Sequence, residues 1–240
     1  MQQLIGKMAR MYPLLIAMGF MIVAIAFVIG YFNSLTVAEY FSQPKAFRET
    51  TLLAERASIE SIGLWLPYFK FFGIGLILSG IVMALRVIIE KLQNAGAEVL
   101  DYLPADLRPA QPSPPWYALM MPMVMMLGLL VFIGALSVGL GLAADARALF
   151  ANPLPTIDTA GAGTALLATF EGIKATSAWL VPFKFFGVAT EFLAIAMGLS
   201  TIVYILAQQT DMIANGIDIG SQSAKAARRE DERAPVYADN

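Results

Sequence analysis

Four stretches of the sequence are long enough and apolar enough to cross a lipid bilayer. They cover roughly residues 13–32, 69–89, 117–143 and 183–206. A hydrocarbon layer of about 30 Å requires about 20 apolar residues at a helical rise of about 1.5 Å each. Inside lipid, an isolated segment satisfies its backbone hydrogen bonds as a helix. We therefore expect an all-α integral membrane protein with four transmembrane helices.

The composition agrees with this class. Hydrophobic residues make up 58% of the 240 residues and charged residues 14%, whereas about a quarter of the residues in ordinary soluble domains are charged. The first stretch follows Lys7 and Arg10, but no signal-peptidase site of small residues comes after it. We interpret it as a retained helix that faces the lipid bilayer.

The distribution of positive charge predicts which side of the membrane the termini occupy. With four spans both termini lie on one side, which carries nine cations: Lys7, Arg10, Arg86, Lys91, Arg108, Lys225, Arg228, Arg229 and Arg233. The other side carries five besides two lysines at helix starts: Lys45, Arg48, Arg56, Arg147 and Lys174. Because cytoplasmic loops are enriched in lysine and arginine, we expect cytoplasmic termini in a bacterial-type inner membrane.

Several kinds of chemistry are excluded by composition. The chain has no cysteine and no histidine, so disulfides, thiol nucleophiles, zinc sites and histidine-ligated haem are excluded. A net charge of −2 provides no basic stripe for nucleic acid. The run MMPMVMM at 120–126 has soft ligands for Cu(I), but we favour adaptable apolar packing. No catalytic motif is visible, so we expect no enzymatic activity, no cofactor and no bound metal.

An internal duplication is the strongest pattern in the sequence. WLPYFKFFG (65–73) and WLVPFKFFG (179–187) share seven of nine residues at an offset of 114. A second set of matches has an offset of 109 and pairs the first span with the third, including Gly19 with Gly128. We predict two copies of a two-helix unit, related by an axis along the membrane normal.

The duplication divides the chain into four parts. Repeat 1 covers 1–97, with its non-cytoplasmic connection at 33–68, and repeat 2 covers 117–213, with its connection at 144–182. A proline-rich cytoplasmic linker at 98–116 joins the repeats, and a polar mobile tail covers 214–240.

Both non-cytoplasmic connections are expected to contain amphipathic helices. In the first, apolar residues recur at helical spacing and Arg56 and Glu60 form an i,i+4 pair. In the second, Thr164 is a candidate N-cap, and Leu166 and Phe170 fall on one face with Ile173. We expect these helices on the membrane surface or against a partner.

The candidate functional residues are charged side chains in or near the spans. Glu191 is an acid about 12 Å inside its span, where it must be protonated, bonded to a neighbour or turned to a polar cavity. Lys184 lies seven residues earlier on roughly the same face, and Lys70 is its repeat mate. The two lysines are either interface anchors or an anion site. Arg86 either reaches outward or pairs with Glu90.

Two further sets of residues are expected to shape the bundle. An aromatic motif should lie at the membrane interface: Trp65, Phe69, Phe71, Phe72, Trp179, Phe183, Phe185 and Phe186. Small residues should let helices approach closely, and the first two pairs are expected to share a contact: Gly80 with Ala84, Ala194 with Gly198, and Ala135 with Gly139.

These features favour one functional hypothesis and leave two others open. The favoured hypothesis is a non-catalytic subunit that packs against other membrane proteins or its own copies and organises a larger complex, such as a respiratory or oxidase assembly. The alternative is a small oligomeric transporter or channel that uses Glu191 with Lys70 and Lys184. The third hypothesis is a protein that binds a lipid or another hydrophobic ligand.

Overall fold

The structure consists of helices joined by short turns. The computed structural model describes residues 10–101 and 113–233. Its four long helices are α2 (Tyr12–Ser42), α4 (Leu53–Asp101), α5 (Trp116–Phe150) and α7 (Ala165–Arg233). Each is long enough and apolar enough to cross a membrane. The prediction of an all-α chain with four candidate spans is therefore confirmed.

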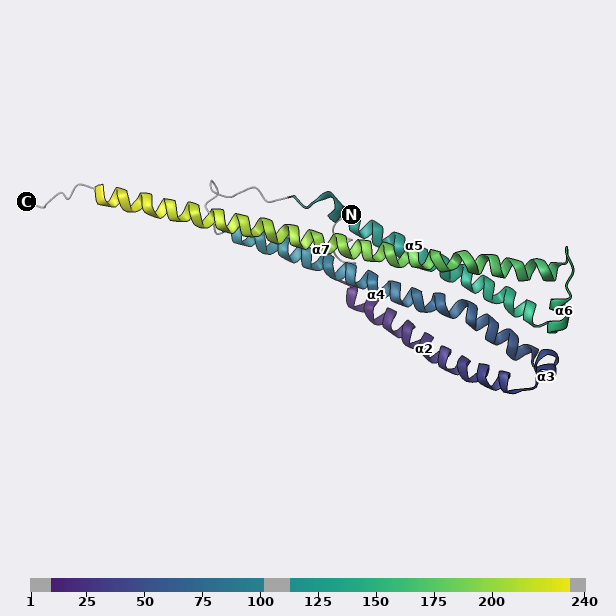
Figure 1. Cartoon of the computed structure of the whole chain (residues 1–240). Coiled ribbons are helices and arrows are strands. Elements are labelled where there is room, and N and C mark those ends of the chain that lie inside the picture. The colour runs from purple at the N-terminus through teal and green to yellow at the C-terminus, as the bar shows by residue number, and fades with distance from the viewer. Residues whose placement is uncertain (1–9, 102–112, 234–240) are drawn as a thin grey trace, which may run out of the picture.

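The long helices form two antiparallel hairpins that lie side by side (Figure 1). α2 and α4 form the first hairpin, joined through the short helix α3 (Lys45–Thr50). α5 and α7 form the second, joined through α6 (Leu154–Asp158). α4 packs against the other three long helices, whereas α2 packs mainly against α4. As a result α4 is central and α2 lies on the outside of the bundle (Figure 1).

The two connections between hairpin helices are built alike. α3 follows Pro44 and α6 follows Pro153, and these prolines have nearly the same backbone angles, with φ of −56° and −55°. Thr164 accepts a hydrogen bond from the backbone N–H of Leu167 at 3.3 Å, which confirms the predicted N-cap of α7. α3 and α6 contact one another at the same end of the bundle.

The amphipathic segments predicted in the two connections are helical, and they continue into the spans. They lead without a break into the second span of each hairpin, because α4 begins at Leu53 and α7 at Ala165. Pro67 and Pro182 lie inside these helices without ending them, as neighbouring helices in a bundle permit. The predicted ion pair of Arg56 with Glu60 is wrong, because the Arg56 guanidinium instead lies 4.7 Å from the ring centroid of Phe150.

The polar tail predicted from residue 214 is helical as far as Arg233, as the C-terminal part of α7. The segment AKAARREDER at 224–233 consists of good helix formers except for Asp231, and an existing helix extends more readily than a new one starts. Residues 234–240 of the predicted tail lie outside the described residues. So do residues 102–112 of the predicted linker, whose first residues, 98–101, belong to α4.

Candidate functional site

Glu191 lies at the junction of three helices and has none of its surface exposed. It projects from α7, and its Oε1 accepts a hydrogen bond of 2.9 Å from the hydroxyl of Ser79 on α4. Gly128 on α5 makes room for it, because a Cβ added at Gly128 would lie only 2.9 Å from the Glu191 Cγ. The carboxyl group therefore joins α7 to both α4 and α5.

The polar environment of this carboxyl group is small. Among the described residues, Ser79 is its only hydrogen-bond donor, and Oε2 has no partner. An unpaired ionised carboxylate inside a bilayer is costly, and a single hydroxyl donor offsets only part of that cost. The sequence predicts a buried acid here, but Ser79 is far away in the chain and no local pattern points to it.

Replacing Ser79 with alanine is expected to destabilise the bundle by about 1–3 kcal/mol, because the buried Oε1 of Glu191 then loses its only donor. Ser137→Ala is the matched control, since the Ser137 hydroxyl is exposed and bonds only the Ile133 carbonyl of its own helix. Both free energies of unfolding can be measured by denaturant titration in mild detergent. Equal losses in the two variants would show that the Ser79 contact contributes nothing.

Lys184 does not pair with Glu191. Its Nζ lies 4.7 Å from the ring centroid of Phe71 and 5.6 Å from that of Tyr68, both on α4. Lysine side chains reach toward the nearer membrane surface, and Lys184 lies about 10 Å from Glu191 along the helix axis. The acid and the lysine that the sequence places on one face are therefore held at different depths.

The two copies of the aromatic motif meet at this level. Phe71 and Phe185 pack edge to face, with ring centroids 5.7 Å apart. Within each copy the tryptophan contacts the phenylalanine four residues later in the same way, with centroids 5.5 Å and 5.4 Å apart: Trp65 with Phe69, and Trp179 with Phe183. Phe72 is half-buried and Phe186 is exposed. Lys70 is exposed beside an apolar groove between α2 and α4.

Arg86 forms the predicted i,i+4 contact with Glu90, with its Nε 3.4 Å from Oε1. The pair lines a polar groove of about 430 Å³ near the end of the bundle opposite α3 and α6. Sequence reasoning missed Gln209 in this groove, whose Nε2 donates a 2.6 Å hydrogen bond to the Leu92 carbonyl. This bond holds α7 against α4 beyond their apolar segments. No sequence motif predicts it.

The small residues make close contacts. The expected contact between the Gly80–Ala84 pair and the Ala194–Gly198 pair does not form, because Gly80 faces α2. A Cβ on Gly80 would meet Ile16 on α2, whereas Ala194 is buried in a cluster formed by residues of α4, α5 and α7. Ala84 is half-buried. Gly198 contacts Met121 as well as Leu85 on α4. Gly80 thus packs on the first helix of its own hairpin, whereas Gly198 contacts both the first helix of its hairpin and α4.

On α5 the small residues receive side chains from α4. The ring of Tyr68 packs directly on Gly139, where an added Cβ would lie 2.5 Å from the ring Cδ2. Ala135 is buried beside the same ring and Leu180.

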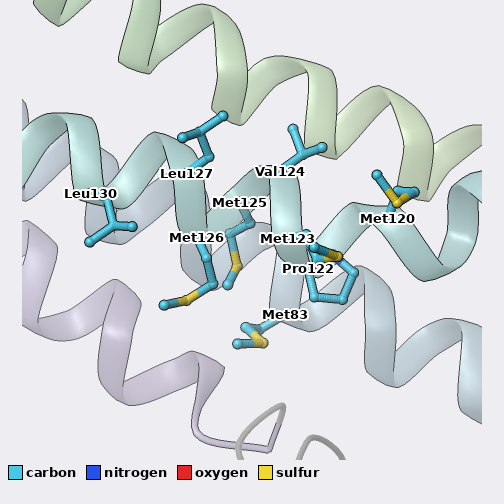
Figure 2. Close-up of a pocket in the computed structure, with 9 residues that line it drawn as sticks. All are labelled: Met83, Met120, Pro122, Met123, Val124, Met125, Met126, Leu127 and Leu130. Carbon is cyan, nitrogen blue, oxygen red and sulfur yellow. The ribbon is translucent and has the colours of Figure 1, made fainter.

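The methionine run lines an apolar groove of about 660 Å³ on one side of α5. Figure 2 shows the side chains of Met83, Met125 and Met126 pointing toward the same space. The full lining is Met83, Met120, Pro122, Met123, Val124, Met125, Met126, Leu127 and Leu130. Flexible thioether side chains give such a groove an adaptable apolar surface.

Comparison with protein-family models, curated proteins and solved structures finds no match. The class of the protein is therefore inferred from the length and apolar character of its own helices. It is a membrane protein whose regular structure is helical over residues 10–101 and 113–233, with four candidate spans in that part of the chain.

Proposed function

We propose that this chain is a non-catalytic, multi-pass membrane subunit that packs against other membrane proteins and organises a larger complex. It belongs in a bacterial-type inner membrane, with both termini in the cytoplasm. A respiratory or oxidase assembly is the kind of complex that such a subunit serves.

The observation that carries the proposal is the paired extension of α4 and α7 beyond the bilayer. At about 1.5 Å per residue, the 69 residues of α7 span about 100 Å, against a hydrocarbon layer of about 30 Å. The end of α4 accompanies α7 through the Gln209 hydrogen bond and through Gly96, which faces the Gln209 side chain. Figure 1 shows both helices projecting from the same end of the bundle. A helical projection of this kind presents a surface for another protein.

A duplicated two-helix unit is part of the proposal, and matching contacts support it. In the first hairpin, Gly73 faces Ile22 and Val23, and in the second, Gly187 faces Val131 and Phe132 at the aligned positions. In the same way Gly19 faces Ile77, and Gly128 faces Glu191. The residues that the two offsets pair therefore occupy equivalent places in their hairpins.

The test is whether a protein partner accompanies this chain in fixed ratio. Crosslinking in intact membranes, followed by mild detergent extraction and mass analysis, is expected to give one defined assembly that holds this chain and a stoichiometric partner. Ending the chain at residue 213 removes the α7 projection but leaves the four candidate spans. We expect this variant to fold and to recover about tenfold less of a membrane partner whose cytoplasmic part contacts the projection. A chain that runs only as a monomer before and after crosslinking would overturn the proposal.

A further inference from the structure

The central helix α4 buries two opposite faces, whereas α7 buries only one. One face of α4 packs on α2, through Gly73 and Gly80. The opposite face is a buried row that repeats every seven residues: Tyr68, Gly75, Val82 and Ile89. Tyr68 and Gly75 in this row contact α5 directly, at Gly139 and Phe132.

The corresponding row on α7 is uncovered. At the offset of 114 the four buried residues of α4 align with four exposed residues of α7: Pro182, Ala189, Ala196 and Val203. Val82 and Ile89 are each 1% exposed, whereas Val203 is 67% exposed. Large apolar side chains flank the row and are also exposed: Phe185, Phe192, Leu193 and Leu199. We call the row and these flanking residues the outer face of α7.

The first helices of the two hairpins differ in the complementary way. Phe132 on α5 lies against both Gly75 of α4 and Gly187 of α7, and it is fully buried. Its aligned residue on α2, Val23, lies against Gly73 of α4 and is only half-buried. α2 therefore has one helix neighbour at this level where α5 has two.

From this mismatch we propose that a second copy of the chain docks its α2 on the outer face of α7 and repeats the contact of α5 with α4. The proposal rests on the proposed function and deepens it, because it names a second copy as the partner in the membrane. The contacts of α5 with α4 in the single chain, transferred by the two offsets, predict which residues meet between copies. Val23 of the second copy meets Ala189, as Phe132 meets Gly75, and Gly30 of the second copy meets Pro182, as Gly139 meets Tyr68.

The orientation of the two hairpins is compatible with docking of a second copy in the same bilayer. Both begin at the same end of the bundle, so a copy added by the same displacement keeps its orientation in the bilayer (Figure 1). Ala189 and Ala196 are small, which allows the close helix approach that association in lipid requires. The contact joins two different surfaces, so successive copies form a ring if the rotation closes.

Disulfide crosslinking tests the proposed contact directly. The chain has no cysteine, so only engineered thiols react. Val23→Cys and Ala189→Cys are placed on separate, differently tagged chains and co-expressed, then oxidised mildly in membranes. A crosslink that contains both tags is expected, because the template contact brings these positions within disulfide reach. Met21→Cys paired with Ala189→Cys is the control, since Met21 is at similar depth but aligns with Leu130 of α5, which is exposed and lines the outward methionine groove.

A second variant tests the same face without a crosslink. Ala189→Leu adds bulk to a side chain that is exposed in the single chain, so the melting temperature should be unchanged. Self-association in nanodiscs, measured by native mass spectrometry, should weaken by about tenfold. Met21→Leu is the control, and its self-association should equal that of the wild type.

The outcomes separate this inference from the proposed function. A crosslink between two Ala189→Cys chains, without the mixed one, would indicate a two-fold contact and overturn the head-to-tail assembly. Absence of any crosslink between copies, together with a different membrane protein in fixed ratio, would overturn the inference and leave the proposed function standing. A monomer without any partner would overturn both.

Discussion

Gly19→Ala is expected to force α2 away from α4 and to lower the free energy of unfolding by about 3 kcal/mol. A Cβ at this position would lie 2.5 Å from the carbonyl oxygen of Gly73 and 2.9 Å from the backbone nitrogen of Ile77. Both are backbone atoms, so no change of side-chain rotamer relieves the clash. Unfolding in mild detergent, followed by tryptophan fluorescence, measures the loss.

Two companion variants identify the cause of that loss. Gly63→Ala on α4 is the control, because a Cβ there has no neighbour within 4 Å among the described residues, and it should stabilise the helix by about 0.5–1 kcal/mol. Ile77→Ala should not rescue Gly19→Ala, since the Ile77 nitrogen and the Gly73 oxygen remain in place. A full rescue by Ile77→Ala would show that α2 and α4 do not approach as closely as the structure places them.

Gly128→Ala should destabilise the second hairpin by about 1–3 kcal/mol, and Glu191→Ala should remove that penalty. The added Cβ would lie 2.9–3.1 Å from three atoms of Glu191, namely Cγ, Cδ and Oε1. All three belong to the side chain that Glu191→Ala deletes. A double-mutant cycle therefore isolates the contact, unlike the backbone clash at Gly19.

The control for this cycle is Gly141→Ala on the same helix. A Cβ at Gly141 meets nothing within 4 Å, so the substitution should be neutral or slightly stabilising with Glu191 present or absent. If Gly128→Ala costs the same in the Glu191→Ala background as in the wild type, the carboxyl group does not occupy the space beside Gly128.

Interactions within one helix are predictable because sequence spacing determines them. Arg86 meets Glu90 one turn later, and Trp65 meets Phe69 in the same way. The Thr164 cap is equally local. The failure at Arg56 shows the limit of this reasoning, because the aromatic ring of Phe150 from another helix competes for the guanidinium group.

Interactions between helices depend on rotation and depth, which a single span does not encode. Lys184 and Glu191 share a face by spacing, yet the lysine lies over Phe71 and the acid accepts a bond from Ser79. Ser79 and Gly128 carry no pattern that marks them as parts of one site. Their meeting depends on how the first hairpin packs against the second.

The sequence by itself determined that this chain is helical, that four segments are apolar enough to span a bilayer, and that one of them contains an acid. These properties follow from hydrophobicity and backbone hydrogen bonding, which act along a single segment. Only the tertiary structure decided that α4 is covered on two faces, that α7 has an exposed outer face, and that Glu191 bonds Ser79. The physical reason is that lipid is as apolar as the helix surfaces, so close packing and individual hydrogen bonds select helix neighbours where hydrophobicity cannot.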